Sequence, residues 1–145
     1  MCGYEEIIDT ILLEPETSAE ERLSSVVSLV LDDITTKRTT HVFTELWAMS
    51  NFDPFVQERV NDMYARARVI YERLVRDINP ALPPDERDLV AIYMTATMEG
   101  FTPFAGFNKA WTHEMEALKR LTIKAFLEVI PSLRPGEVRG HLSAH

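Results

Sequence analysis

The segment from residue 85 to residue 107 limits the possible folds of this chain more than any other stretch. At the helical period its apolar side chains fall on two neighbouring faces rather than on one. A helix that covers a single core needs an apolar arc of only about 100°. The first face comprises Leu89, Ile92, Tyr93 and Ala96, and the second comprises Val90, Met94, Thr97, Met98 and Phe101. The pattern predicts a helix that is covered from two sides, by its own core and by a ligand, a partner or a second copy.

Length and composition indicate a single helical domain. The chain has 145 residues, of which 46% are hydrophobic, and this is enough for a sizeable core. A net charge of −8 argues against a nucleic-acid-binding surface, because affinity for phosphates comes from clustered Lys and Arg. The only cysteine is Cys2, which excludes an internal disulfide and a thiolate metal cluster. No apolar run approaches the roughly 20 residues of a membrane span, and we find no leader pattern. We therefore expect a cytoplasmic protein that has no membrane partner.

Helix signals in the first half of the chain predict four helices. A short helix over residues 4–13 is followed by a second helix, which begins at the overlapping capping boxes of Thr17 and Ser18. The buried stripe of this second helix is expected to be Leu23, Val26, Val27, Val30 and Ile34. Residues 35–40 are either a turn or the start of a third helix, whose apolar face continues to Phe52. Asp53-Pro54 then starts the longest helix, which ends at Asn79, because Asp is a favoured N-cap and Pro a favoured first residue.

The second half predicts two more helices, for about six in all. Pro83-Pro84 starts the central helix, and Gly100, Pro103 and Gly106 suggest that it kinks or breaks into a short second piece. The final helix is expected over residues 111–130. Pro131 ends this helix, and we expect residues 131–145 to form a frayed tail after a single domain over residues 1–130.

Two segments carry more specific patterns than a generic helix. VFTELWAMSNFDPFV, residues 42–56, places an aromatic-rich helix before a long helix that starts with Asp-Pro. PPDERDLVAIYMTATMEGF, residues 83–101, ends in Glu99-Gly100-Phe101. Together these segments resemble the C-terminal regulatory domain of TetR-family transcription regulators, in which a helix of the second kind packs in the dimer interface. The resemblance extends over residues 4–130, and residues 4–13 resemble the end of the helix that links the two halves of such regulators.

The resemblance implies an all-α, TetR C-terminal-like domain of about six helices that dimerises through a four-helix bundle. It implies the sensory and dimerising half of a repressor, which forms a homodimer and binds a small, largely apolar effector. The family's helix-turn-helix lies ahead of this domain, and nothing in the sequence corresponds to it. We therefore expect no direct binding of nucleic acid by this chain. The alternative is a stand-alone helical interaction module that heterodimerises with intact relatives.

No pattern in the chain indicates catalysis or a metal site. The sequence has no G-x-S-x-G motif and no Gly-rich phosphate loop. His41 and Glu45 lie one helical turn apart, but a solvated pair near a helix start is the commoner origin of such spacing. Di-metal carboxylate bundles use Glu-x-x-His pairs, whereas Arg38 and Ala110 stand three residues before His41 and His113. We therefore expect neither an enzyme nor a resident metal or cofactor.

Aromatic and methionine side chains predict an apolar pocket between the helices. Residues 43 and 47 share one helical face, and residues 93 and 97 share another. Ligand sites are mostly apolar with a few polar tips, and methionine adapts to irregular shapes. The expected lining residues are Phe43, Trp47, Met63, Tyr64, Tyr93, Met94, Thr97 and Phe101. The alternative is an ordinary core in which the same side chains interdigitate and leave no void.

Overall fold

The computed structural model describes residues 8–14 and 16–140, and in these ranges it is helical with no strand. The described α-helices are α2 (Ala19–Ile34), α3 (Lys37–Ser50), α4 (Pro54–Ile78), α5 (Pro84–Glu99), α6 (Thr102–Ala105) and α7 (Met115–Ser132). A 3-10 helix, η1 (Thr112–Glu114), leads into α7, and residues 8–12 are also helical. The predicted all-α class with about six helices is confirmed. Cys2 and residues 4–7 of the first expected helix lie outside the described ranges.

Side-chain caps set the starts of α2, α3 and α4. The Ser18 hydroxyl accepts a hydrogen bond from the Glu21 N–H at 3.1 Å at the start of α2. At the start of α4, the Asp53 carboxylate accepts one from the Phe55 N–H at 3.0 Å. Such side chains satisfy N–H groups that have no partner inside the helix. The segment 35–40 proves to be a helix start, because Thr36 is the N-cap of α3.

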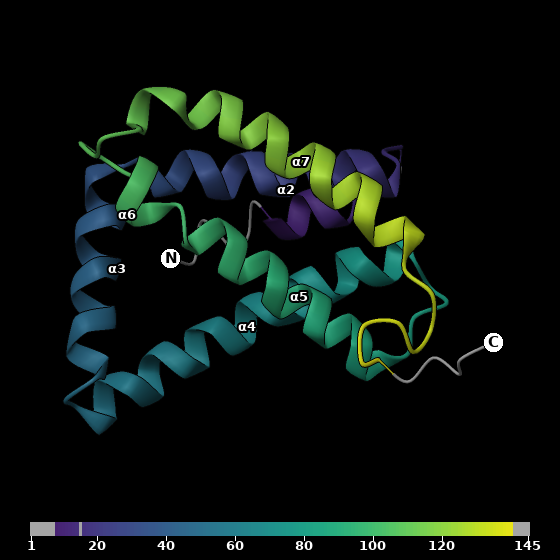
Figure 1. Ribbon diagram of the computed structural model, residues 1–145, viewed down its shortest axis with the longest axis horizontal. Coiled ribbons are helices and arrows are strands. Elements are labelled where there is room, and N and C mark those ends of the chain that lie inside the picture. The colour runs from purple at the N-terminus through teal and green to yellow at the C-terminus, as the bar shows by residue number, and fades with distance from the viewer. Residues whose placement is uncertain (1–7, 15, 141–145) are drawn as a thin grey trace.

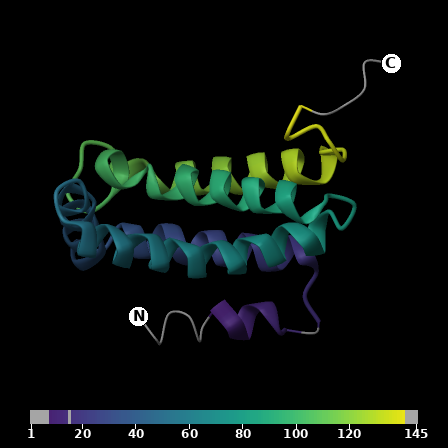
Figure 2. The same cartoon turned by 90° about the horizontal axis from the view of Figure 1, so that it is seen from below.

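The helices form two layers, with α3 at one end of both (Figures 1 and 2). Figure 2 shows α5 and α7 in one layer and α2 and α4 in the next, with the helical residues 8–12 beyond them. Between the layers, α4 packs most extensively against α5, and α2 packs against α7. None of the helices in the described part of the chain is long and apolar enough to cross a membrane.

The hydrophobic core lies between the two layers. The stripe predicted for α2 is confirmed, since all five of its residues are buried. Two further helices contribute a large part of the remaining core, with Tyr71, Leu74 and Val75 from α4 and Val90, Ala91, Met94 and Met98 from α5. Burial of these side chains removes apolar surface from water, which is the main force that holds the layers together.

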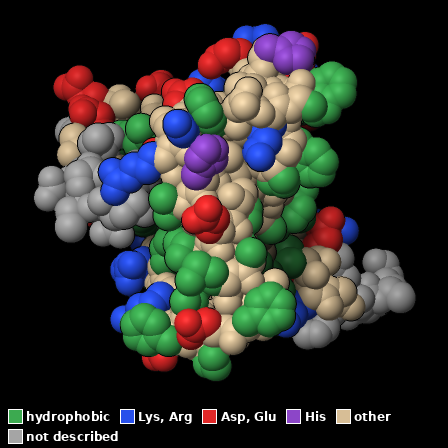
Figure 3. Space-filling model, turned by 90° about the vertical axis from the view of Figure 1, so that its left-hand side faces the viewer, with side chains coloured by type: hydrophobic (Ala, Val, Ile, Leu, Met, Phe, Trp, Pro, Cys, Tyr) green, Lys and Arg blue, Asp and Glu red, His purple; other side chains and the backbone are tan. Residues whose placement is uncertain are grey.

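Only one of the two apolar faces expected for α5 is covered within the chain. The exposed apolar side chains of this layer include Ile92 (47% exposed) and Tyr93 (62%) on α5, and Leu121 (63%) and Val129 (48%) on α7. Figure 3, a view from the α3 end, shows hydrophobic side chains along the right-hand edge, on the side of α5 and α7. The outer surface of this layer is therefore apolar and uncovered in the single chain.

The last helix begins later and ends later than the sequence predicts. Trp111 precedes η1 and is 56% exposed, and Pro131 lies within the last turn of α7 instead of ending it. The carbonyl groups at a helix C-terminus lack partners within the helix. Here the Asn79 side-chain amide, after α4, donates to the carbonyl oxygens of Ile130 at 2.9 Å and Leu133 at 2.8 Å. This contact gives a partner to the carbonyl groups of Ile130 and of the C-cap residue Leu133, and it holds the end of α7 against the end of α4.

Residues 133–140, which we name the C-terminal strap, are packed onto the domain, and this corrects the expectation of a frayed tail over residues 131–145. The buried carboxylate of Glu86 on α5 accepts hydrogen bonds from the backbone N–H groups of Gly136 at 2.5 Å and Arg139 at 3.0 Å. Leu133 and Val138 pack against the core. The two hydrogen bonds to Glu86, an ion pair of 3.0 Å between Arg139 and Asp85, and the apolar contacts of Leu133 and Val138 thus hold the strap on the domain. Residues 141–145 lie outside the described ranges.

Candidate ligand-binding site

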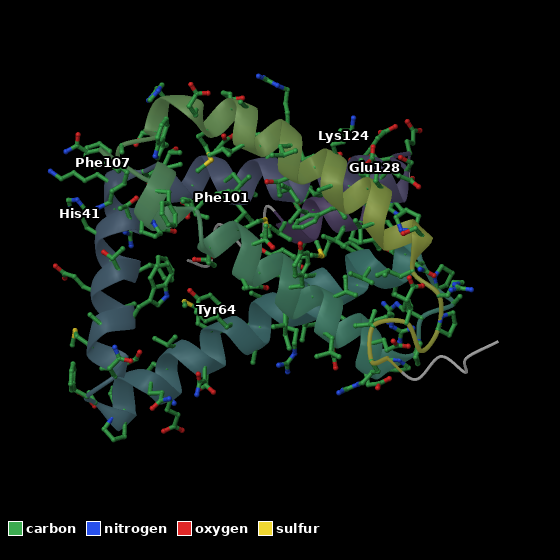
Figure 4. The ribbon with its side chains drawn as sticks, viewed as in Figure 1. His41, Tyr64, Phe101, Phe107, Lys124 and Glu128 are labelled. Carbon is green, nitrogen blue, oxygen red and sulfur yellow. The ribbon has the colours of Figure 1, made fainter. Side chains whose placement is uncertain are left out.

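A cavity of about 570 Å³ lies between α3, α4 and α5 and ends near α6. It is lined by Trp47 from α3, by Asn61, Tyr64, Ala65 and Arg68 from α4, by Ile92, Thr95, Ala96 and Glu99 from α5, and by Gly100 and Pro103 beyond α5. The space arises because α3 and α4 diverge from the turn at residues 51–53, while α5 crosses α4 further along (Figure 1). Figure 4 shows Tyr64 pointing from α4 into the space between α3 and α5.

A chain of hydrogen bonds connects the three helices at the inner end of the cavity. The indole N–H of Trp47 donates to the hydroxyl oxygen of Tyr64 at 2.7 Å. The Tyr64 hydroxyl in turn donates to Oε2 of Glu99 at 3.3 Å. Because an indole is a donor only and an ionised carboxylate is an acceptor only, the direction of this chain is fixed when Glu99 is ionised. It runs from α3 through α4 and ends on the Glu99 carboxylate of α5.

Burial dominates the electrostatics of this group. Desolvation raises the pKa of Glu99 to about 7, with a smaller contribution from the negative charge of Asp33, while the hydrogen bond from Tyr64 acts in the opposite direction. Burial, followed by the charge of Glu99, raises the pKa of Tyr64 well above its usual value, and the same two causes raise the pKa of Tyr71. Both tyrosines therefore stay protonated, and Tyr64 remains a donor.

Tyr64 and Glu99 also separate the cavity from a smaller chamber of about 70 Å³. The chamber is lined by Val30, Asp33 and Ile34 from α2, Thr39 and Phe43 from α3, Met63, Tyr64, Ala67 and Tyr71 from α4, and Glu99 from α5. Both spaces share the Tyr64 and Glu99 side chains in their walls. The hydrogen bond between these two residues is therefore part of the partition between the cavity and the chamber.

A third hollow, of about 280 Å³, lies between α5, α7 and the strap. It is lined by Leu89, Val90, Tyr93 and Met94 from α5, by Ala125, Phe126, Val129 and Ile130 from α7, and by Leu133 and Val138 from the strap. The rings of Tyr93 and Phe126 meet edge to face, with their centroids 6.4 Å apart. This groove belongs to the outer layer and is separate from the cavity.

The eight residues predicted to line one pocket are distributed over these spaces. Trp47 and Tyr64 line the cavity, whereas Phe43 and Met63 line the small chamber together with Tyr64. Tyr93 and Met94 line the groove between α5 and α7. The remaining two, Thr97 and Phe101, line none of the three spaces: the Thr97 hydroxyl donates to the Tyr93 carbonyl at 2.7 Å, and Phe101 packs against the core.

The expected cavity face of α5 is therefore corrected. Residues 93, 94, 97 and 101 were expected to face the pocket, but residues 92, 95, 96 and 99 do so. The cause is the rotation of α5 about its axis, because Val90, Met94 and Met98 fill the core between the layers. This packing turns the neighbouring face, which carries Ile92 and Glu99, toward α3 and α4.

The predicted set of lining residues did not include several polar residues of the cavity. Arg68 was not among the predicted site residues, and Glu99 was interpreted only as part of a motif on a helix that packs in the dimer interface. The available signal for Glu99 was its position as the only charged residue between Asp88 and Lys109, since carboxylates are rarely buried without a reason. In the described residues, no group of three or more His, Cys, Asp or Glu side chains gathers as metal ligands.

The all-helical architecture is consistent with that of a TetR-type regulatory domain. A family model described as "BetI-type transcriptional repressor, C-terminal" matches residues 19–128, and the chain belongs to this family. The match covers α2 to α6, η1 and most of α7. This is a family of transcription regulators and not of enzymes. Searches of curated proteins and of solved structures returned no match.

Proposed function

We propose that this domain senses a small, largely apolar effector in the cavity between α3, α4 and α5, as the regulatory half of a TetR-like repressor in the cytoplasm. The observation that carries the proposal is the cavity itself. Its volume of about 570 Å³ lies within the range of roughly 300–1,000 Å³ typical of small-molecule sites. Its walls are mainly apolar, and a small number of polar groups gather around Tyr64 and Glu99.

The second part of the proposal is a homodimer through α5 and α7. The outer face of these helices carries the exposed side chains of Tyr93, Leu121 and Val129. Large apolar surfaces of this kind mark interaction sites, and a two-fold pairing of α5 and α7 would form a four-helix bundle. Obligate homodimers bury upward of about 2,000 Å² in such interfaces. DNA would be contacted through a helix-turn-helix outside this domain, because a net charge of −8 repels phosphate.

Tryptophan fluorescence and sedimentation test the two parts separately. Trp47 donates to Tyr64 at the cavity, whereas Trp111 is exposed near η1. An apolar probe such as phenethyl alcohol should change the emission of the wild type and of Trp111→Phe, but not that of Trp47→Phe. Sedimentation at micromolar concentration should show twice the monomer mass. The chain would instead be an interaction module if its emission did not change with the probe, if it sedimented as a monomer, and if it bound an intact TetR-family relative.

A further inference from the structure

We infer that the effector carries a protonated amine, which binds the Glu99 carboxylate at the inner end of the cavity. This inference rests on the proposed function and specifies the chemistry of the same site. The apolar part of the effector would lie against Trp47, Ile92 and Pro103, which line the cavity around Glu99.

The hydrogen bonds of the site leave an acceptor facing the cavity. Trp47 donates to Tyr64, and Tyr64 donates to Oε2 of Glu99, so each donor of this chain is already engaged. Tyr64 is the one donor to the Glu99 carboxylate among the described residues, which leaves Oε1 without a partner there. A carboxylate accepts several hydrogen bonds when it is ionised. A ligand that complements the ionised Glu99 carboxylate must therefore bring N–H or O–H donors.

The charges around Glu99 favour a cationic donor. On α2, Asp33 has the same sign as Glu99 and raises its pKa. On α4, Tyr64 and Tyr71 are neutral, and Arg68 lines the cavity without forming an ion pair with Glu99. The wall from α3 is Trp47, and α6 adds no charge. In the described part of the chain, no Lys, Arg or His lies within ion-pair distance of Glu99, and a buried carboxylate without a counter-ion is costly.

Binding of an amine should therefore release a proton from Glu99. In the free domain burial raises the pKa of Glu99 to about 7, so a substantial fraction of the molecules carry a neutral carboxyl group at neutral pH. A nearby positive charge favours the ionised carboxylate and lowers its pKa. The affinity for an amine should consequently rise between about pH 6 and about pH 8. A ligand that offers only acceptors would show the opposite dependence.

Three probes of similar shape distinguish the possibilities: phenethylamine, phenethyl alcohol and hydrocinnamate, which are cationic, neutral and anionic at neutral pH. Calorimetric titration of the 145-residue chain should give at least about tenfold tighter binding of the amine than of the alcohol, since charge-assisted hydrogen bonds are about twice as strong as neutral ones. In buffers of different ionisation enthalpy, the amine titration should show proton release. Glu99→Gln, which keeps an acceptor for Tyr64, should remove the preference for the amine, whereas Glu45→Gln on the exposed side of α3 should retain it.

Each outcome decides the question. If the alcohol binds and the amine binds no more tightly, or if hydrocinnamate binds most tightly, the amine inference is wrong while the cavity remains a ligand site. Tightest binding of hydrocinnamate would identify Arg68 as the anchor. If none of the three probes binds the wild type, both the inference and the proposed function are wrong. The comparison of probes on the wild type and the measurement of proton release remain decisive even if Glu99→Gln does not fold.

Discussion

The hydroxyl group of Thr40 accepts a hydrogen bond of 2.8 Å from the backbone N–H of Phe107, which lies 67 residues further along the chain. The same hydroxyl donates to the Ile34 carbonyl at the end of α2, also at 2.8 Å. Gly106 permits this approach, because a Cβ atom there would lie 2.7 Å from the Thr40 hydroxyl. Figure 4 shows His41 and Phe107 together at this corner, and their ring centroids lie 5.9 Å apart. The corner joins α2, α3 and α6 next to the cavity.

Replacement of Thr40 by Val should destabilise the domain by about 1–3 kcal/mol, because it leaves two backbone groups at a buried position without their partner. The measurement is urea unfolding followed by circular dichroism. Thr44→Val is the matched control, since the Thr44 hydroxyl donates within its own helix to the Thr40 carbonyl at 2.8 Å. Its effect should stay within about 0.5 kcal/mol. Equal losses in the two variants would contradict the role assigned to Thr40.

The partly buried carboxyl group of Glu99 should make the stability of the domain fall as the pH rises. Its pKa is raised by burial from 4.5 to about 7, so the folded state binds the proton more tightly than the unfolded state does. The resulting stabilisation is complete below about pH 4.5 and is lost as the pH rises through about 7. The loss is on the order of 2–3 kcal/mol.

The check for Glu99 is urea unfolding of the wild type and of Glu99→Gln across this pH range. The neutral side chain of the variant does not titrate. The free energy of unfolding of Glu99→Gln should therefore rise relative to that of the wild type as the pH increases. Glu128→Gln is the control, because the side chain of Glu128 is 67% exposed on α7. Parallel pH profiles for the wild type and Glu99→Gln would show that the Glu99 carboxyl group is solvated.

Acid should weaken the hydrogen bonds between the strap and Glu86. This contribution to stability therefore has the opposite pH dependence from that of Glu99. The backbone N–H groups of Gly136 and Arg139 lower the pKa of Glu86, with Gly136 as the largest cause. The carboxylate therefore stabilises the strap above the usual pKa of a glutamate, and this stabilisation is lost as the pH falls through the lowered value. Hydrogen exchange of the Gly136 and Arg139 amides should be slow near neutral pH in the wild type and much faster in Glu86→Gln. Equally slow exchange in both would mean that apolar packing and the ion pair between Arg139 and Asp85 hold the strap without Glu86.

The parts of the fold that depend on local signals could be predicted from the sequence. Ser18 and Asp53 cap the helices they were expected to cap, because an N-cap acts on amides two or three residues away. The buried stripe of α2 follows from a helical period that repeats within one element. The boundaries of these helices require no knowledge of the rest of the chain.

The parts that depend on distant contacts could not be predicted. Pro131 reads as the end of a helix, but Asn79 lies 51 residues before Ile130 and supplies the cap that extends α7. The strap is fixed by Glu86, which lies 50 residues before Gly136. The rotation of α5 about its axis likewise depends on how the layers pack. An apolar pattern on two faces does not determine which of these faces points toward the core. For this reason Trp47 and Tyr64 were placed at the cavity, whereas the face of α5 opposite them was not.

Replacement of Leu121 by Glu should separate the proposed dimer without unfolding the domain. Leu121 lies on the outer face of α7 and is 63% exposed in the single chain, so a charge there is solvated in the monomer. In a pairing of α5 and α7 with a second copy, the same charge would be buried without a partner, at a cost of several kcal/mol. Sedimentation at micromolar concentration should therefore show the wild type as a dimer and Leu121→Glu as a monomer with unchanged helical circular dichroism. Phe52→Glu is the matched control, because Phe52 is 89% exposed in the turn between α3 and α4, and this variant should remain dimeric. A dimeric Leu121→Glu variant, or a Phe52→Glu variant that dissociates, would place the interface elsewhere.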